Sequence, residues 1–236
     1  MRDIKTNVVW KHLETSKKKI IIEQGGSRSG KTYNILMWIV FGYCLRNKNK
    51  IVSVCRKTFP ALRTSALRDF LEILKNYELY KEEDHNKTSS EYKLNGNLIE
   101  FISLDSPQKV RGRKRDLLFI NEANELFWED WNQLIFRTVG RVILDYNPSD
   151  EFHWIYDKVK TREDADFFKT TYKNNKFLEE SIVKEIERLQ YTDENYWRIY
   201  GLGEIGQSKS TIFNFREIET IPDNAKFISM GMDFGY

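Results

Sequence analysis

Residues 20–36 read IIIEQGGSRSGKTYNIL, and this stretch decides the fold. It opens with a short apolar run, Ile20 to Glu23, of the kind that forms strands buried on both faces. A glycine-rich turn follows, and apolar residues then recur at helical spacing from Tyr33 to Leu45. The stretch therefore predicts a buried strand, a tight loop and a helix in direct succession.

The turn between this strand and this helix has the pattern of a phosphate-binding loop (P-loop). Gly25 and Gly30 frame four residues and are followed by Lys31 and Thr32. The glycines permit backbone torsions that turn successive N–H groups inward, and the helix dipole adds to the attraction for phosphate. We expect Lys31 to reach the β and γ phosphates of ATP and Thr32 to hold Mg²⁺. The predicted ATP-binding residues are Gly25, Gly26, Ser27, Arg28, Ser29, Gly30, Lys31 and Thr32.

Some features of this region stay open at the level of sequence. A glycine-rich turn without any ligand is the simpler alternative to a P-loop. Arg28 either pairs with phosphate or a nearby carboxylate and reports the nucleotide state, or points into solvent. Upstream, Trp10, His12 and Gln24 are placed where an adenine base would stack or hydrogen-bond, although Trp10 better suits a buried core position.

The rest of the chain repeats the alternation of strand and helix. Further strands are expected at Ile51–Cys55, Leu117–Ile120 and Arg141–Leu144, with helical spacing from Ala61 to Leu74. This succession predicts the α/β class, a P-loop NTPase core with a mostly parallel central sheet flanked by helices. The stretch EYKLNGNLIEFISL alternates around Asn95-Gly96, which predicts a β-hairpin insertion at one edge of the sheet.

Composition limits the class of protein. The 236 residues are 40% hydrophobic and 31% charged, which suits a soluble globular chain and excludes a disordered one. A net charge of +3 argues neither for nor against nucleic acid. No apolar run approaches the ~20 residues needed to span a bilayer, so we expect no membrane contact and a cytoplasmic location. Cys44 and Cys55 are too few for a disulfide framework and are expected to be small buried hydrophobes.

A second element of the predicted site follows the strand at Leu117–Ile120. Glu122 lies where a general base would polarise the water that attacks ATP. The preceding position, where an aspartate usually anchors the water shell of the metal, is Asn121. An amide adds no negative charge, so Mg²⁺ affinity should be weaker or Glu122 must share the role. A plain acidic helix cap is the alternative for Glu122.

Several segments together resemble a known family. In chain order they are GGSRSGKT, VCRKTFPALRTSALRDF, FISLDSPQKVRG, LLFINEANEL, ILDYNPSDEFHWIY, TTYKNNKFL and GEIG. This series resembles the large terminase subunit of tailed phages over almost the whole chain. In that family an N-terminal ATPase drives double-stranded DNA into a preformed capsid, and a C-terminal ribonuclease H-like endonuclease cuts the DNA concatemer.

The resemblance implies cofactors, partners and a location. ATP and Mg²⁺ serve the ATPase, and two divalent metals (Mg²⁺ or Mn²⁺) serve the nuclease domain. The implied partners are double-stranded DNA, the portal protein of the procapsid and the small terminase subunit. The family assembles as a homo-oligomeric ring on the portal, whereas this chain alone is expected to be a monomer. The implied location is the cytoplasm of the bacterial host.

The resemblance also assigns roles to individual residues. It makes Lys31 and Glu122 catalytic, and Arg111 an arginine offered to the ATP of a neighbouring subunit. Arg113 competes for the role of Arg111, and a solvated basic loop that touches DNA phosphates is the alternative to both. The predicted metal contacts of the ATPase are Thr32, Asn121 and Glu122. The coupling motif that senses loss of the γ-phosphate matches Asp145, Tyr146 and Asn147, where an ordinary Asn-Pro turn is the alternative.

The last part of the chain is expected to differ from the core. Residues 1–206 are predicted to form the ATPase domain, with a small helical lid subdomain at 178–206. Residues 207–236 are predicted to be a linker and the first strand of a truncated nuclease domain. The resemblance places Asp233 there as one carboxylate of an incomplete metal site, so nuclease activity should be absent.

Two other classes of function also fit the P-loop. A helicase or recombination ATPase would use the same Lys31 and Glu122. A nucleotide-binding regulator that does not hydrolyse ATP is conceivable because of Asn121. Stimulation by a procapsid portal without strand separation would favour the packaging motor over the first class, and measurable turnover would exclude the second.

Overall fold

The computed structural model describes residues 4–105, 114–207 and Lys226. The described residues form an eight-stranded sheet in the order β3-β4-β5-β2-β6-β7-β1-β8. From β5 to β8 along this order, neighbouring strands are parallel, whereas β3 and β4 add an antiparallel edge. The strands are β1 (Ile20–Gly25), β2 (Ile51–Arg56), β3 (His85–Asn86), β4 (Glu91–Leu94), β5 (Asn97–Ser103), β6 (Arg115–Ile120), β7 (Thr138–Tyr146) and β8 (Ala165–Thr170). The predicted mostly parallel α/β sheet is confirmed.

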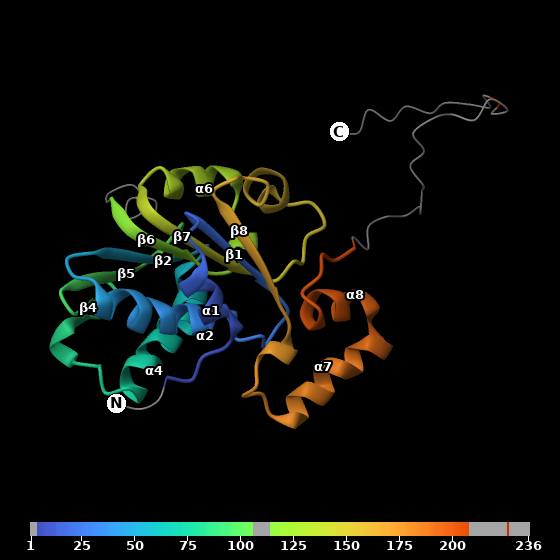
Figure 1. Ribbon diagram of the computed structural model, residues 1–236, viewed down its shortest axis with the longest axis horizontal. Helices are drawn as coiled ribbons and strands as arrows, with labels where there is room; N and C mark the ends of the chain where they lie inside the picture. Colours follow the sequence, from blue (N-terminus) through green and yellow to red (C-terminus); the bar gives the residue numbers. More distant parts are fainter. Residues whose placement is uncertain (1–3, 106–113, 208–225, 227–236) are drawn as a thin grey trace.

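Helices cover both faces of the sheet (Figure 1). On one face lie α1, α2 with its continuations η1 and η2, and the run α3-η3-α4; on the other lie α6 and η6. The bounds are α1 (Val8–Thr15), α2 (Lys31–Met37), η1 (Trp38–Tyr43), η2 (Cys44–Arg46), α3 (Phe59–Leu62), η3 (Arg63–Leu67), α4 (Arg68–Asn76), α6 (Trp128–Ile135) and η6 (Ile155–Val159). Short turns complete this part: η4 (Glu82–Asp84), η5 (Ala123–Glu125) and η7 (Tyr172–Asn174).

Strand β1 shows why the central strands contain continuous apolar runs. Ile21 packs into the core under α1 and α2, whereas Ile20 and Ile22 pack into the core under α6 and η6. Successive side chains of a strand point to opposite faces, so a strand covered on both sides has a continuous apolar run. The buried polar residues of β1, Glu23 and Gln24, follow this run near the carboxyl end of the strand. Cys44 and Cys55 are buried free thiols in these cores, as predicted.

The predicted hairpin is present and forms an edge of the sheet. β4 pairs antiparallel with β5, and Leu94 faces Asn97 across the turn. Asn95 and Gly96 have φ values of 52° and 78°, the left-handed pair that a tight hairpin turn requires. The opposite edge is formed by β8, a strand that the sequence does not predict. Its residues, ADFFKT, are only partly buried and mix charged with aromatic side chains, so it lacks the apolar run of the central strands.

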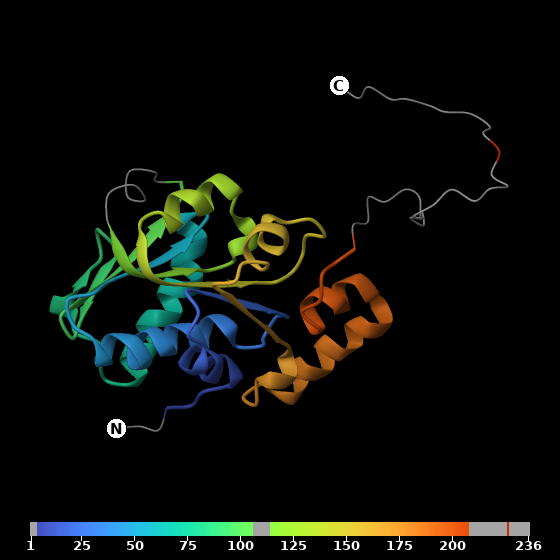
Figure 2. The same ribbon diagram turned by 45° about the horizontal axis from the view of Figure 1, so that its top comes forward.

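A small helical unit lies beyond the β8 edge. It consists of α7 (Glu180–Thr192), α8 (Glu194–Tyr196) and η8 (Trp197–Gly201), which Figures 1 and 2 show beside the end of β8. Its own apolar cluster centres on Tyr172, Ile186 and Trp197. These helices fall within the segment predicted as a lid. The linker and nuclease strand predicted for 207–236 lie outside the described residues, except for Gln207 and Lys226. Across the described ranges, no helix is both long enough and apolar enough to cross a bilayer.

Candidate active site

The glycine-rich loop joins the end of β1 to the start of α2. β1 ends at Gly25 and α2 begins at Lys31, so the predicted strand, loop and helix are confirmed. Arg28 and Gly30 have φ values of 61° and 81°, in the left-handed region. These reversals turn the backbone around a concave centre, which is the shape of an anion nest. The carboxyl ends of β6 and β7 open at the same edge of the sheet.

Lys31 is buried against the loop that precedes it. Its Nζ donates hydrogen bonds to the carbonyl oxygens of Gly25 at 2.9 Å and Gly26 at 3.0 Å. It also donates to Oδ1 of Asn147 at 2.9 Å, which joins the loop to the end of β7. Burial lowers the pKa of Lys31, while the nearby carboxylate of Asp145 raises it. The side chain therefore lies at the position from which a P-loop lysine reaches phosphate.

Asp145 is the acid on which the other polar groups of the site converge. Its carboxylate accepts hydrogen bonds from the Thr32 hydroxyl, from Nδ2 of Asn121 at 2.9 Å and from the backbone N–H of Glu122 at 2.9 Å. Burial raises the pKa of Asp145, whereas Lys31 and these hydrogen bonds lower it. Asp145 thus ties the loop, β6 and β7 together at one point.

Glu122 follows β6 in an unusual backbone conformation. Its φ of 52° and ψ of 58° are left-handed, which costs on the order of 1–3 kcal/mol for a residue with a side chain. Burial is the main cause that raises the pKa of Glu122 to about 7, and the negative charge of Asp145 is the second. The positive charges of Lys31 and Arg56 act in the opposite direction and lower this pKa. Backbone strain of this kind makes Glu122, at the end of a core strand, a candidate for a functional role.

The residues of the predicted coupling motif connect the site to the helical unit. Besides Asn147, which contacts Lys31, Tyr146 donates from its hydroxyl to Oε1 of Gln24 at 2.9 Å. Gln24 in turn donates from Nε2 to the carbonyl oxygen of Gly203 at 2.7 Å. A line of hydrogen bonds therefore runs from β7 through β1 to the segment that follows η8.

The loop also contacts the helical unit directly. The backbone N–H of Ser27 donates to the carbonyl oxygen of Tyr200 at 2.8 Å. On the other side, Nδ2 of Asn175 donates to the carbonyl oxygen of Arg28 at 2.8 Å. A Cβ on Gly26 would collide with the carbonyl oxygen of Tyr200. These contacts could not be predicted from the sequence, because no short motif indicates a contact between residues so far apart in the chain.

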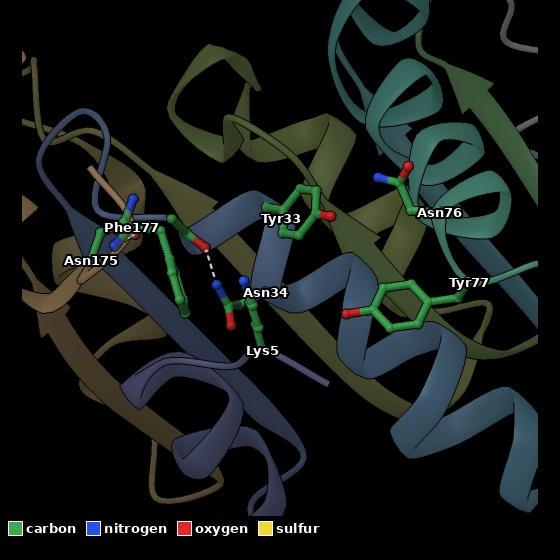
Figure 3. Close-up of a pocket in the computed structure, with 8 residues that line it drawn as sticks. Lys5, Tyr33, Asn34, Asn76, Tyr77, Asn175 and Phe177 are labelled. Atoms are coloured by element: carbon green, nitrogen blue, oxygen red, sulfur yellow. Dashed lines mark hydrogen bonds between the residues drawn. The ribbon is translucent and has the colours of Figure 1, made fainter. Parts of the chain in front are cut away.

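A cavity of about 600 Å³ opens beside the loop (Figure 3). It is lined by Lys5, Gly30, Tyr33, Asn34, Asn76, Tyr77, Asn175 and Phe177. These residues come from the N-terminal segment, the loop and α2, the end of α4 and the segment before α7. Aromatic rings and amide side chains alternate around the space, which suits a flat heterocycle with polar edges.

The upstream candidates for the adenine base are engaged elsewhere. Gln24 is buried in β1, and its side-chain amide is hydrogen-bonded to Tyr146 and Gly203. His12 lies 2.6 Å from Glu23 through Nδ1, and Trp10 packs partly buried against the core, as expected. Arg111, Arg113 and Asp233 lie outside the described residues.

Comparison with known proteins identifies the family. A sequence profile for the phage terminase large subunit matches residues 17–204, which is most of the chain. The chain belongs to the phage terminase large subunit family. The resemblance of the quoted motifs to this family is thereby confirmed.

Curated terminase relatives match over most of this chain. The PBSX phage terminase large subunit of Bacillus subtilis (strain 168) is 26% identical over 250 residues, covering 90% of this chain and 57% of that protein. The terminase large subunit of Bacillus phage SPP1 is 25% identical over 256 residues, covering 97% of this chain and 60% of that protein. The chain thus spans only 57–60% of the length of these terminases.

Solved terminase structures share the fold. The large terminase of a thermophilic bacteriophage aligns with a TM-score of 0.71 at 20% identity, covering 85% of this chain and 53% of that chain. This thermophilic-phage terminase has also been solved with ADP and with ATP-gamma-S. The ATPase domain of the Thermus phage P74-26 large terminase aligns with a TM-score of 0.60 at 15% identity, covering 85% of this chain and 94% of that chain. The fold of this chain is therefore that of a terminase ATPase domain.

Proposed function

We propose that this chain is the ATP-hydrolysing part of a DNA-packaging motor. In this role it couples ATP hydrolysis to the movement of double-stranded DNA into a procapsid. The observation that carries the proposal is the meeting of Lys31, Thr32 and Glu122 around the buried Asp145. Membership of the terminase family, and the ADP and ATP-gamma-S complexes of the thermophilic-phage terminase, support nucleotide as the ligand.

The chemistry follows from the positions of these groups. The backbone N–H groups of the loop and Lys31 would bind the phosphates of ATP. Glu122 would orient and deprotonate the attacking water, and its raised pKa suits a base that works near neutral pH. Thr32, Asn121 and Glu122 would hold Mg²⁺, which would supply positive charge opposite the phosphates.

The cavity beside the loop is our proposed site for the adenine base. Gly30, Tyr33 and Asn34 line it from the loop and the first turn of α2, where phosphate would be held. A nucleotide with its phosphates in the loop would extend from there into the cavity. The rings of Tyr33 and Phe177, two of the lining residues labelled in Figure 3, would offer apolar contact to the base.

The helical unit at 178–206 is our proposed lid. It contacts the loop through the bond from Ser27 to Tyr200, and β1 through the bond from Gln24 to Gly203. A change in the loop during hydrolysis would alter these bonds and so shift the lid and attached DNA. The proposed coupling residues Asp145, Tyr146 and Asn147 lie on the same route.

The proposed partners follow from the family. They are double-stranded DNA, the portal protein and the small terminase subunit, in the cytoplasm of the bacterial host. On the portal the chain would form a ring, with Arg111 or Arg113 reaching the neighbouring nucleotide. DNA contacts would be mainly to phosphate and would weaken with salt, because a translocating motor must ignore sequence. An endonuclease that uses divalent metals would belong to the full-length protein.

The central test compares nucleotide binding with turnover. Lys31→Ala should abolish ATP binding, because it removes the buried cation of the loop. Glu122→Gln should bind ATP but lower kcat by at least about 100-fold, the usual range for loss of a general base. Binding would be measured by calorimetry and turnover by phosphate release, with DNA and portal present.

The matched control is Lys48→Ala, which removes an exposed lysine outside the loop. It should behave as the parent protein does. Negligible turnover in the parent that stays unchanged in Glu122→Gln would favour a regulator that does not hydrolyse ATP. Unchanged binding in Lys31→Ala would overturn the nucleotide site. Strand separation without portal stimulation would favour a helicase.

A further inference from the structure

The position that usually supplies the metal-anchoring aspartate holds Asn121. In P-loop NTPases this acid at the end of a core strand adds negative charge beside Mg²⁺. The site described above still contains a buried acid of that kind, but it lies on another strand. Asp145 stands at the end of β7, which lies between β1 and β6 in the sheet.

Asp145 contacts the residue that defines the metal position. Thr32 is the hydroxyl that a P-loop offers to Mg²⁺, and it donates to Oδ2 of Asp145. The other oxygen, Oδ1, accepts from Asn121 and from the backbone of Glu122, each at 2.9 Å. Asp145 is therefore the carboxylate that adjoins Thr32, and it is held in place by two donors from β6 and its following turn.

Asn121 is oriented as a donor toward this acid. Its Nδ2 faces Asp145, while its Oδ1 accepts a hydrogen bond from the Ser65 hydroxyl at 3.3 Å. An aspartate at position 121 would replace that donor with a second carboxylate at the same short distance. Two such carboxylates cannot both ionise in a buried site without a large cost. Asn121 and Asp145 thus form a complementary pair in which only one member carries charge.

We propose that Asp145 supplies the negative charge that holds Mg²⁺ in the nucleotide complex, and that Asn121 is a positioning residue for it. The inference rests on the proposed ATPase function and assigns one of its parts. In this chain the acid stands on β7 and the amide follows β6. Mg²⁺ affinity is then not weakened by Asn121, because the charge is provided from the neighbouring strand.

The test measures how strongly Mg²⁺ increases nucleotide affinity. Binding of a fluorescent, non-hydrolysable ATP analogue would be titrated in EDTA and in excess Mg²⁺, and the ratio of the two Kd values taken. Asp145→Asn should lower this ratio by about tenfold or more, the usual effect of losing an outer-shell group. In EDTA the same variant should bind the analogue at least as tightly as the parent, because a carboxylate that repels phosphate is gone.

An exchange variant separates charge from structure. Asp145→Asn combined with Asn121→Asp restores one acid and one amide in the pair, and should recover much of the Mg²⁺ dependence. Asn121→Asp alone should lower the melting temperature, because it places two acids together. If the melting curve of Asp145→Asn shows that this variant does not fold, the ratio of Kd values measured for the exchange variant tests the proposal instead.

Several results would overturn the inference. One is an unchanged ratio in Asp145→Asn, and another is an equal loss of affinity with and without Mg²⁺, which would make Asp145 only structural. An exchange variant that folds but shows no Mg²⁺ dependence would do the same. If the parent protein binds no nucleotide in either condition, the proposed function fails and the inference fails with it. Lys31→Ala, expected to lose binding in both conditions, reports on the function alone.

Discussion

At the residue scale, the site depends on acids that are buried near one lysine. Glu23 lies on β1 and has no exposed surface. Its Oε1 is hydrogen-bonded to Nδ1 of His12 at 2.6 Å. Burial raises the pKa of Glu23 to about 7, although His12 and Lys31 lower it. The same cause raises the pKa values of Glu122 and Asp145. The strand that carries the loop therefore includes an acid whose charge depends on pH near neutrality.

This raised pKa predicts a pH dependence of stability. A carboxyl with a pKa of about 7 when folded and 4.5 when unfolded binds its proton more tightly in the folded state. Its stabilising contribution is complete below the unfolded value and is lost as pH rises through the folded value. The free energy of unfolding of the parent should fall by about 2 kcal/mol relative to Glu23→Gln between pH 5 and pH 7.5.

Urea denaturation of both proteins at several pH values measures this difference. Glu185→Gln, which changes an exposed acid on α7, is the control and should show a difference that does not vary with pH. If the free energies of unfolding of the parent and of Glu23→Gln differed by the same amount at every pH, Glu23 would be ionised in the folded protein.

At the scale of elements, the loop and the helical unit are packed against each other without room for a side chain. Gly26 lies where a Cβ would meet the carbonyl oxygens of Tyr200 and Gly201. Gly203, with φ of 64°, packs its backbone against Gly25 and Gly26. Close backbone contact of this kind allows a small movement of the loop to be transmitted to η8.

Gly26→Ala should therefore separate the loop from η8. The expected cost is about 1–3 kcal/mol of stability, as for other overpacked sites, with faster amide hydrogen exchange in α7 and η8. Hydrogen exchange followed by mass spectrometry measures this locally. Ser181→Ala, at an exposed position of α7, should leave the exchange rates as they are. Exchange confined to the loop itself would argue against the proposed coupling.

At the scale of the whole molecule, the proposed base site exists only because distant segments meet. The N-terminal segment, α2, α4 and the segment before α7 each contribute lining residues to the cavity. Phe177 is 57% exposed, and Lys5 lies over its ring with Nζ 5.8 Å from the centroid. An exposed aromatic ring beside a polar cavity is suited to stack on a base.

Phe177→Ala should weaken ATP binding by about 2- to 10-fold, the range for one aromatic contact. Binding of inorganic tripolyphosphate, which has no base, should be unchanged, because the loop is intact. Competition against a fluorescent nucleotide measures both. Phe152→Ala removes another exposed phenylalanine, 85% exposed and outside the cavity lining, and should affect neither ligand. Equal weakening of both ligands would place the base elsewhere.

Much of the fold and part of the site were predictable from local sequence. Alternation of apolar runs with helical spacing identified the central strands, because a strand covered on both faces is mostly apolar. The fixed interval from Gly25 to Lys31 identified the loop. Gly30 has a left-handed φ that favours glycine, and the close approach of Thr170 leaves no room for a Cβ on Gly25. Asn95-Gly96 identified the hairpin for the same reason. These features are set by short-range sterics and burial, which the sequence determines by itself.

Only the tertiary structure decided which of the site residues bond to one another. The bond from Thr32 to Asp145, the orientation of Asn121, and the contacts of Ser27 with Tyr200 all join residues far apart in the chain. The order of strands brings β7 between β1 and β6, so an acid on β7 can take the place left by an amide after β6. Sequence spacing carries no record of such neighbours, because they are set by how the sheet is assembled.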